Sequence, residues 1–181
     1  MQMILPSAFH TQPWKNGGGI THEIAREDRD GALLWRLSIA EVASDGPFSA
    51  FTGLSRILTV IEGAGLHLHS PDGRLDALPL RPLAFSGGLA IESRMIDGPI
   101  RDFNVIFDGN RLAVSVTLVN APRDCPATPG RRYAWLALAA RTSLDGRKIP
   151  IGSVVLFEQS LPLIAENSGG LLVTFEQKPT N

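Results

Sequence analysis

The chain has 181 residues, of which 44% are hydrophobic and 19% charged, and its 17 basic and 18 acidic residues leave a net charge of −1. This balance is typical of a globular protein and excludes a disordered chain. Because proteins that bind nucleic acid or membrane surfaces usually carry a basic excess, we expect neither partner.

Short strands are predicted along the whole chain, because apolar and polar residues alternate between turns rich in glycine and proline. Trp35, Leu37 and Ile39 alternate with other residues, and a stretch rich in β-branched residues runs from Arg56 to Glu62. Further strands are expected at 66–69, 83–85, 89–91, 103–107, 112–119, 134–139, 154–157 and 171–175. Many short strands at regular spacing favour an all-β fold, a sandwich or a barrel.

The alanine-rich stretch 133–144 could also form a helix, but the turn Asp145-Gly146 after it fits a hairpin better. This turn belongs to a faint repeat. Asp72-Gly73-Arg74 precedes an apolar run that ends at Phe85, and Asp145-Gly146-Arg147 precedes one that ends at Phe157. Such spacing is consistent with two related lobes.

Cys125 is the only cysteine, which excludes an intrachain disulfide and a metal cage of cysteines. The residues from Met1 to Pro6 lack the basic and apolar regions of a signal peptide. The longest apolar run, 133–140, is too short to span a bilayer. We therefore expect a cytoplasmic protein.

His67 and His69 are two residues apart on a predicted strand, so their side chains share a face and could hold a metal ion. A metal barrel with three histidines and a carboxylate needs a further histidine from a later strand, and none follows His69. A pair of half-exposed histidines on an edge strand is the alternative that we favour. We expect neither a metal nor another cofactor.

The segment Trp14-Lys15-Asn16-Gly17-Gly18-Gly19 is unusual. Successive glycines allow positive φ angles and close approach of the backbone, so their N–H groups could form a nest for an anion. On composition alone, a glycine-rich turn that leads into a strand explains the same residues.

Two arginines lie in apolar strands, where a charge that faces a barrel interior is costly unless it is paired. Arg36 and Arg56 could converge with Asp102 and Asn104 on a pocket for a small carboxylate, since arginine binds carboxylates through two parallel hydrogen bonds. Alternatively, the arginines pair with Asp102 or Glu23 as structural ions. The pattern favours the two interpretations equally.

The chain resembles the HutD/Ves family in segments that cover roughly residues 6 to 107. These segments are Trp14-Lys15-Asn16-Gly17-Gly18-Gly19-Ile20-Thr21-His22-Glu23-Ile24, Trp35-Arg36-Leu37-Ser38-Ile39-Ala40, Asp45-Gly46-Pro47-Phe48-Ser49-Ala50-Phe51-Thr52-Gly53 with Arg56 following, and Asp97-Gly98-Pro99 leading to Asp102-Phe103-Asn104-Val105.

The resemblance implies a cupin (RmlC-like) β-barrel in a two-lobed bicupin, with a motif-bearing lobe at about 1–110 and a smaller lobe at 111–181 that shares strands with it. It also implies an association with bacterial histidine utilisation, or a stress-linked role for the Ves branch. By analogy with other cupins, a homodimer would form through sheet edges.

Within the cupin pattern, the stretch from Phe48 to Phe51 aligns with the two histidine ligands of metal cupins, and Arg56 falls near their carboxylate ligand. Phenyl rings cannot ligate a metal, and an arginine repels a cation. The resemblance therefore implies that a fixed guanidinium has replaced the metal, which favours an anionic ligand.

The first hypothesis is a non-metal cupin that senses or modulates histidine utilisation by binding urocanate, formiminoglutamate or formylglutamate. Arg36 and Arg56 would clamp this small anionic metabolite, and Asp102 and Asn104 would orient either the metabolite or the arginines. The remaining candidates are Lys15, Asn16 and Ser49 as polar contacts and Trp14, Phe48 and Phe51 as apolar walls.

The second hypothesis is a metal-independent isomerase or hydrolase with His22, Glu23 or Asp102 as its acid or base. The third is a metal-dependent cupin that uses His67 and His69. The sequence favours a binding protein over an enzyme.

Overall fold

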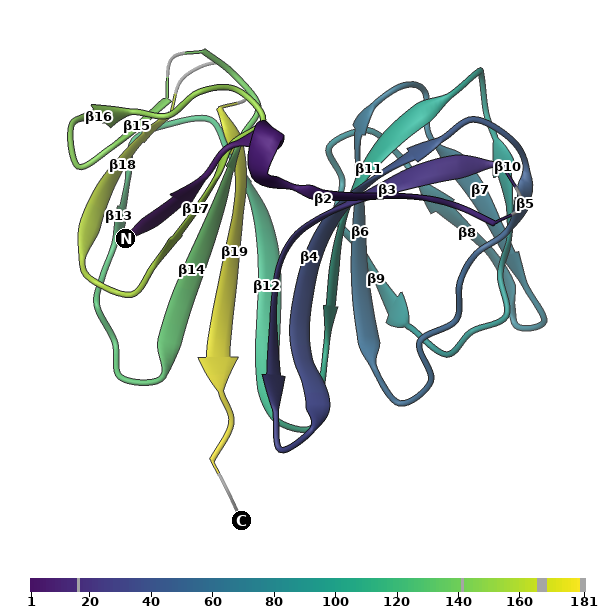
Figure 1. Cartoon of the computed structure of the whole chain (residues 1–181), viewed down its shortest axis with the longest axis horizontal. Coiled ribbons are helices and arrows are strands. Elements are labelled where there is room, and N and C mark those ends of the chain that lie inside the picture. The colour runs from purple at the N-terminus through teal and green to yellow at the C-terminus, as the bar shows by residue number, and fades with distance from the viewer. Residues whose placement is uncertain (16, 141, 166–168, 180–181) are drawn as a thin grey trace. The chain divides into compact units, whose positions relative to one another are not determined.

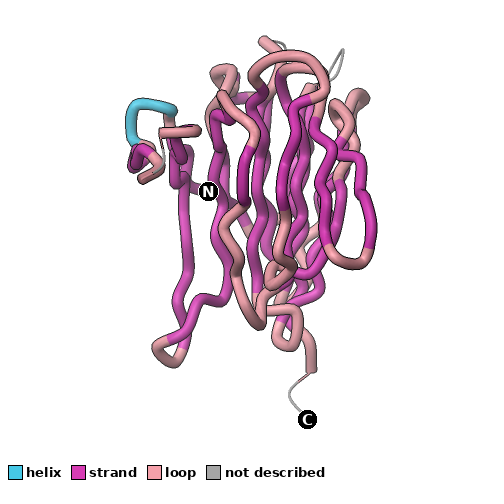
Figure 2. Tube along the Cα trace, turned by 90° about the vertical axis from the view of Figure 1, so that its right-hand side faces the viewer, coloured by secondary structure: helices cyan, strands magenta, loops and turns pink. Residues whose placement is uncertain are grey.

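A computed structural model describes residues 1–15, 17–140, 142–165 and 169–179. Strands dominate these residues, and the only helical element among them is the short 3-10 helix η1 (Pro6–Ala8), drawn in cyan in Figure 2. The predicted all-β class is therefore confirmed. No helix in the described part of the chain is long and apolar enough to cross a membrane.

The chain divides into two compact units, which we call the first lobe (Phe9–Gly109) and the second lobe (Met1–Ala8 with Asn110–Asn181). The first eight residues belong to the second lobe because the strand β1 (Gln2–Ile4) pairs with the strand β17 (Val154–Phe157). The strand pattern did not predict this contribution, since the three residues of β1 are too few to alternate recognisably.

The first lobe contains two sheets, and Figure 1 labels their strands. The six-stranded sheet has the order β2-β3-β4-β11-β6-β9, and the four-stranded sheet has the order β5-β10-β7-β8. The strands are β2 (His10–Pro13), β3 (Gly19–Arg29), β4 (Ala32–Val42), β5 (Gly46–Pro47), β6 (Ser55–Glu62), β7 (Leu66–Ser70), β8 (Gly73–Ala77), β9 (Leu83–Ser86), β10 (Glu92–Met95) and β11 (Ile100–Phe107).

The core of the first lobe joins residues from both of its sheets. Val42, Leu58 and Val60 come from the six-stranded sheet, and Leu66 and Leu68 come from the four-stranded one. All five are almost fully buried. Because residues two apart on a strand share a face, Leu58 lies with Val60 and Leu66 with Leu68.

The second lobe also contains two sheets, of order β1-β17-β14-β19-β12 and β13-β18-β15-β16. Its further strands are β12 (Leu112–Val119), β13 (Arg123–Cys125), β14 (Arg131–Ala137), β15 (Thr142–Leu144), β16 (Arg147–Lys148), β18 (Leu161–Ala165) and β19 (Gly170–Gln177). Its core is apolar and aromatic. Trp135 is fully buried in it, and the rings of Tyr133 and Phe157 stack with centroids 5.0 Å apart.

The stretch 133–144 forms strand and not helix. Its described residues contribute to β14 and β15, and Asp145-Gly146 closes the hairpin between β15 and β16. Both turn residues have positive φ, 52° and 71°, as the favoured two-residue hairpin turn requires. The predicted hairpin is confirmed.

The two lobes repeat one strand order. In the first lobe the order β4-β11-β6-β9 stands beside β5-β10-β7-β8, and adding eight to each label gives β12-β19-β14-β17 and β13-β18-β15-β16 in the second. The turns that begin at Asp72 and Asp145 lie at equivalent hairpins, β7–β8 and β15–β16. This correspondence supports a two-lobed bicupin, which stays a prediction.

Candidate functional site

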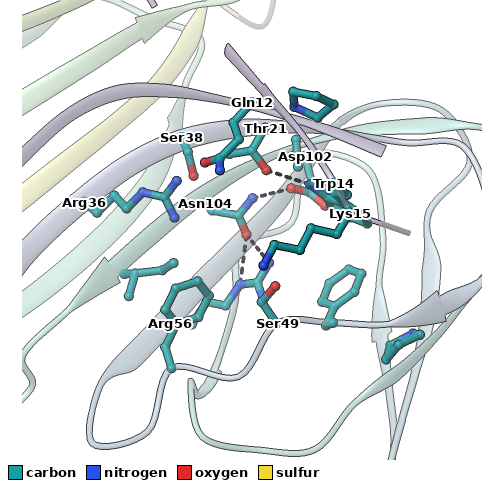
Figure 3. Close-up of a pocket in the computed structure, with 16 residues that line it drawn as sticks. Gln12, Trp14, Lys15, Thr21, Arg36, Ser38, Ser49, Arg56, Asp102 and Asn104 are labelled. Carbon is teal, nitrogen blue, oxygen red and sulfur yellow. Dashed lines mark hydrogen bonds between the residues drawn. The ribbon is translucent and has the colours of Figure 1, made fainter. Parts of the chain in front are cut away.

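The first lobe contains a cavity of about 530 Å³, shown in Figure 3. Residues of β2, β3, β4, β6 and β11 form part of its wall, and the segments around Lys15 and Ser49 form the rest. The lining residues are Gln12, Pro13, Trp14, Lys15, Thr21, Arg36, Ser38, Ala40, Pro47, Phe48, Ser49, Phe51, Arg56, Asp102, Asn104 and Ile106.

The structure brings nine of the ten predicted ligand-binding residues together around this cavity. They are Trp14, Lys15, Arg36, Phe48, Ser49, Phe51, Arg56, Asp102 and Asn104. The tenth, Asn16, lies outside the described residues. What these residues bind stays a prediction.

Strand register explains why residues far apart in sequence meet here. Along β11, Asp102 pairs with Ala40 of β4 and Asn104 with Ser38. Ile106 pairs with Arg36 on one side and with Arg56 of β6 on the other. Because alternate residues of a strand share a face, this register gathers the polar side chains on one wall.

Arg56, Asn104 and Asp102 form a hydrogen-bonded chain across that wall (Figure 3). The Nε and Nη2 atoms of Arg56 donate to Oδ1 of Asn104 at 2.9 and 2.5 Å. The Nδ2 atom of Asn104 in turn donates to Oδ1 of Asp102. Since Asn104 accepts on one side and donates on the other, its amide orientation is fixed.

Arg56 is a buried cation packed between aromatic rings. It is only 8% exposed, and its Cζ atom lies 4.8 Å from the ring centroid of Phe48 and 5.6 Å from that of Phe85. Burial lowers the pKa of Arg56, the nearby charge of Asp102 raises it, and that of Arg36 lowers it. An arginine nonetheless stays protonated in proteins, so the wall carries a fixed positive charge.

Asp102 is a buried carboxyl group that is incompletely bonded. It is 1% exposed, and its Oδ2 atom has no hydrogen-bond partner among the described residues. Burial raises the pKa of Asp102 to about 6, against the opposing effects of the Arg56 charge and the Asn104 hydrogen bond. The cavity wall therefore carries an acceptor that titrates near neutral pH.

Arg36 forms an ion pair with Glu23, as the alternative in which the arginines are structural ions predicted. Its Nε atom donates to Oε2 of Glu23 at 2.5 Å, and both side chains are partly exposed. Arg56 differs from that alternative, because its hydrogen bonds go to Asn104 and reach Asp102 only through that amide. Within the described part of the chain, Arg56 is thus the arginine of this pair to which no carboxylate is hydrogen-bonded.

The glycine-rich segment is a turn. The N–H of Gly17 donates to the carbonyl of Trp14 at 3.0 Å, and the N–H of Trp14 donates to the carbonyl of Gly19 at 2.9 Å. The Gly17 amide is therefore not free to form an anion nest. The turn presents Trp14 and Lys15 to the cavity, and Nε1 of Trp14 donates to Oγ1 of Thr21 at 2.8 Å.

The candidate catalytic residues His22 and Glu23 do not line the cavity. The ring nitrogens of His22 lie 2.9 Å from Oγ1 of Thr11 and 3.1 Å from Oε1 of Glu41, and Glu23 bonds to Arg36. Of the three candidates, the structure places only Asp102 at the cavity.

His67 and His69 lie outside the cavity as well. Since Leu66 and Leu68 of the same strand are in the core, the two histidines point to the opposite face. Nδ1 of His67 lies 2.7 Å from Oδ1 of Asp76. No group of three or more potential metal ligands occurs among the described residues.

Several cavity residues were missed from the sequence. Ser38 shares a face with Arg36 by strand alternation, which is a signal that was available. Gln12 lies on the short strand β2, which carries no clear pattern. Phe85 reaches Arg56 because β9 pairs with β6, and no local sequence pattern predicts that pairing.

The arrangement is suited to binding an anion. The lining contains the cations Lys15, Arg36 and Arg56 and the single carboxyl group of Asp102, with aromatic rings beside them. A desolvated guanidinium that is fixed by hydrogen bonds binds a carboxylate strongly and directionally.

Distant structural neighbours share the fold. The structure of bacterial pirin YhhW in complex with nickel(II) from Escherichia coli matches with a TM-score of 0.71 at 8% identity, covering 99% of both chains. Quercetin 2,3-dioxygenase from Acinetobacter baumannii matches with a TM-score of 0.62 at 13% identity, covering 98% of this chain and 79% of that one. These cupin-type proteins confirm the predicted cupin fold.

Closer relatives point to one family. HutD from Pseudomonas fluorescens SBW25, solved in a formate condition, matches with a TM-score of 0.87 at 30% identity and covers 98% of this chain and 99% of that one. An uncharacterised 21.2 kDa protein in the hutC 3′ region of Pseudomonas putida is 40% identical over 61% of this chain and 60% of its own. Protein Ves of Escherichia fergusonii is 36% identical over 59% of this chain and 58% of its own.

The alignments with these two curated relatives thus span about three fifths of their lengths. The family model named HutD covers more, matching residues 6–172. The chain therefore belongs to the HutD family.

Proposed function

We propose that the first lobe binds a small carboxylate of histidine catabolism, such as urocanate, formiminoglutamate or formylglutamate. In this proposal the chain is a sensor or modulator of histidine utilisation, with which the HutD family is associated. The observation that carries the proposal is Arg56, a buried guanidinium at the cavity wall that an amide holds and to which no carboxylate of the described residues is bonded.

The energetics of burial support an anionic occupant. Taking a cation out of water is costly unless an anion and further hydrogen bonds compensate it. Nε and Nη2 of Arg56 each donate to Asn104. Nη1 of Arg56 donates to no acceptor among the described residues. Arg36 adds a second positive charge close by. A carboxylate that enters the cavity would compensate Arg56, whereas Arg36 already pairs with Glu23.

The rest of the lining supports a small, partly planar ligand. Trp14, Phe48 and Phe51 provide flat apolar surfaces, and Lys15 adds a flexible cation. The segment that carries Phe48 and Phe51 is anchored, because their backbone N–H groups donate to the carbonyls of Ile91 and Gly87. In the bicupin that we infer, the second lobe has its interior filled by apolar side chains, so the binding role falls to the first.

A thermal-shift series on metal-stripped protein tests the proposal. The panel contains urocanate, formiminoglutamate, formylglutamate, histidine and formate. A ligand at 100 times its dissociation constant adds about 2.7 kcal/mol of stability, which for a chain of this size raises Tm by roughly 5–10 °C. We expect such a shift for at least one of the three pathway carboxylates.

Matched arginine variants locate the binding. Arg56→Met removes the buried charge at similar length and should abolish the shift, while Arg94→Met changes an exposed arginine of the same lobe that does not line the cavity and should preserve it. Circular dichroism verifies that both variants fold. An unchanged shift in the folded Arg56 variant, or no shift with any pathway carboxylate, would contradict the proposal.

A metal-independent enzyme, an isomerase or hydrolase, is the second candidate, and Asp102 is the observation that favours it. Its pKa of about 6 and its unpartnered Oδ2 atom suit a general base at neutral pH. Turnover of a panel compound by metal-free protein, lost in Asp102→Asn, would establish this function. Binding without turnover would leave the sensor role.

A further inference from the structure

The carboxyl group of Asp102 on the cavity wall indicates more about the ligand than that the ligand is an anion. Oδ2 of Asp102 is buried, belongs to a residue that lines the cavity, and has no hydrogen-bond partner among the described residues. A buried polar atom without a partner is unfavourable, and a buried carboxylate oxygen especially so. The structure therefore leaves this buried acceptor without a donor among the described residues.

Among the residues that the structure describes, no side chain supplies the missing donor. Nδ2 of Asn104 is committed to Oδ1 of Asp102, and Arg56 is held by the other end of that amide. Nε1 of Trp14 donates to Thr21. The donors of Asn104 and Trp14 are thus directed to other atoms, and no described residue bonds to Oδ2 of Asp102.

We propose that the ligand carries two groups: a carboxylate that binds Arg56 and an N–H donor that binds Oδ2 of Asp102. This inference rests on the proposed function and narrows its ligand class to carboxylates that also contain an imidazole, formimino or similar N–H group. Asp102 is then the residue that determines specificity, and Arg56 is the residue that provides affinity for the anion.

The spacing of the two groups follows from the strand. Asp102 and Asn104 are two residues apart on β11, which separates their Cα atoms by about 6–7 Å. Because one Asn104 amide bridges Arg56 and Asp102, that amide and two hydrogen bonds separate the guanidinium from the carboxyl group. A ligand whose carboxylate and N–H lie several bonds apart can reach both, and formate cannot.

Two ligands of nearly the same shape test this inference. Urocanate has an imidazole N–H, and 3-(2-furyl)acrylate has the same acrylate carboxylate and a furan ring with no N–H donor. We expect isothermal titration to show that wild-type protein binds urocanate roughly 10- to 100-fold more tightly than 3-(2-furyl)acrylate. This ratio corresponds to one hydrogen bond to a charged group.

Two carboxyl variants assign the preference to Asp102. In Asp102→Asn, an amide replaces the carboxylate and can present N–H to the ligand, so the ratio of the two affinities should fall to about one. Asp72→Asn changes an exposed carboxylate in the turn between β7 and β8, outside the cavity, and should retain the wild-type ratio.

The outcomes separate this inference from the proposed function. If wild-type protein binds both ligands equally, or if Asp102→Asn keeps the urocanate preference, the role of Asp102 is wrong while carboxylate binding stands. If neither ligand nor any other pathway carboxylate binds, the proposed function itself is wrong.

Discussion

At the scale of single residues, the cavity is built on an unusual division of hydrogen bonds. Asn104 accepts from Arg56 and donates to Asp102, so a neutral amide separates a buried cation from a buried carboxyl group. Direct pairing of the two charges would leave neither available to a ligand. Separation keeps the guanidinium and one carboxyl oxygen at the cavity wall.

The buried carboxyl group predicts how stability depends on pH. The pKa of Asp102 rises from about 3.8 to about 6 on folding because of burial, so between these values the folded state binds the proton more readily. The free energy of unfolding should therefore increase as the pH falls from about 6 to about 4, with up to about 3 kcal/mol from this group. Urea unfolding at several pH values measures it.

Comparison with Asp102→Asn isolates this contribution from the other carboxyl groups of the chain. The stability of the wild type relative to the variant should rise as the pH is lowered through this window and level off below it. Parallel pH profiles for the two proteins would show that Asp102 does not titrate with a raised pKa.

Much of this residue-scale site could be predicted from the sequence, because charges inside apolar strands are costly and so stand out. Arg36, Arg56 and Asp102 stand out in that way, Asn104 shares a strand face with Asp102, and all four line the cavity. Their partners could not be predicted. Whether Arg56 bonds to Asn104 or to Asp102 depends on side-chain rotamers and strand register, which alternation alone does not determine.

At the scale of elements, the turn before β3 holds the upper wall of the cavity in place. A Cβ atom at Gly19 would meet the carbonyl oxygen of Glu41 and would lie 3.1 Å from the ring of Trp14. The absence of a side chain thus lets β3 approach β4 and lets Trp14 pack over the backbone. This explains one of the three consecutive glycines without any role in anion binding.

Gly19→Ala should therefore destabilise the fold by about 1–3 kcal/mol, since the added methyl group has no room. It should also displace Trp14 and weaken ligand binding. Chemical unfolding and titration with the best ligand of the panel measure the two effects. Gly88→Ala is the control, because its Cβ would lie 3.4 Å from its nearest neighbour. Equal stability of the two variants would contradict this view of the turn.

The strand elements themselves could be predicted where they are long and alternate, as in β4, β6 and β12. The four-residue strands β9 and β17 were predicted from their apolar runs, but other short strands were not, because so short a stretch contains too few alternations. β2 and β5 are examples, and both contribute residues to the cavity. Pairing between distant segments, such as β1 with β17, also leaves no local pattern.

At the scale of the whole molecule, the two lobes repeat a strand order but differ in what fills them. The first contains the polar cavity, and the second contains a core with the fully buried Trp135. The faint Asp-Gly-Arg repeat predicted related lobes, and its two copies do lie at equivalent hairpins. The different interiors could not be predicted from this repeat, since it involves exposed turns.

This difference predicts that stability and binding can be separated. Leu163→Ala removes a buried side chain of the second lobe and should cost about 2–5 kcal/mol of stability. At a temperature where the variant remains folded, its affinity for the ligand should stay within about twofold of the wild type, as for distant independent sites.

Leu58→Ala is the matched change in the first lobe, where Leu58 pairs with Asn104 across β6 and β11. It should lower both stability and affinity, because Asn104 positions Arg56. Thermal unfolding and isothermal titration of both variants provide the comparison. A large loss of affinity in the Leu163 variant would contradict the assignment of binding to the first lobe.

The central claim is that a small carboxylate binds beside Arg56, and a crystal structure with the tightest ligand of the panel tests it most directly. We expect electron density for the ligand in the cavity of the first lobe. The ligand's carboxylate should lie within hydrogen-bonding distance of the Arg56 guanidinium. Density for the ligand at another place, or a carboxylate directed away from Arg56, would contradict it.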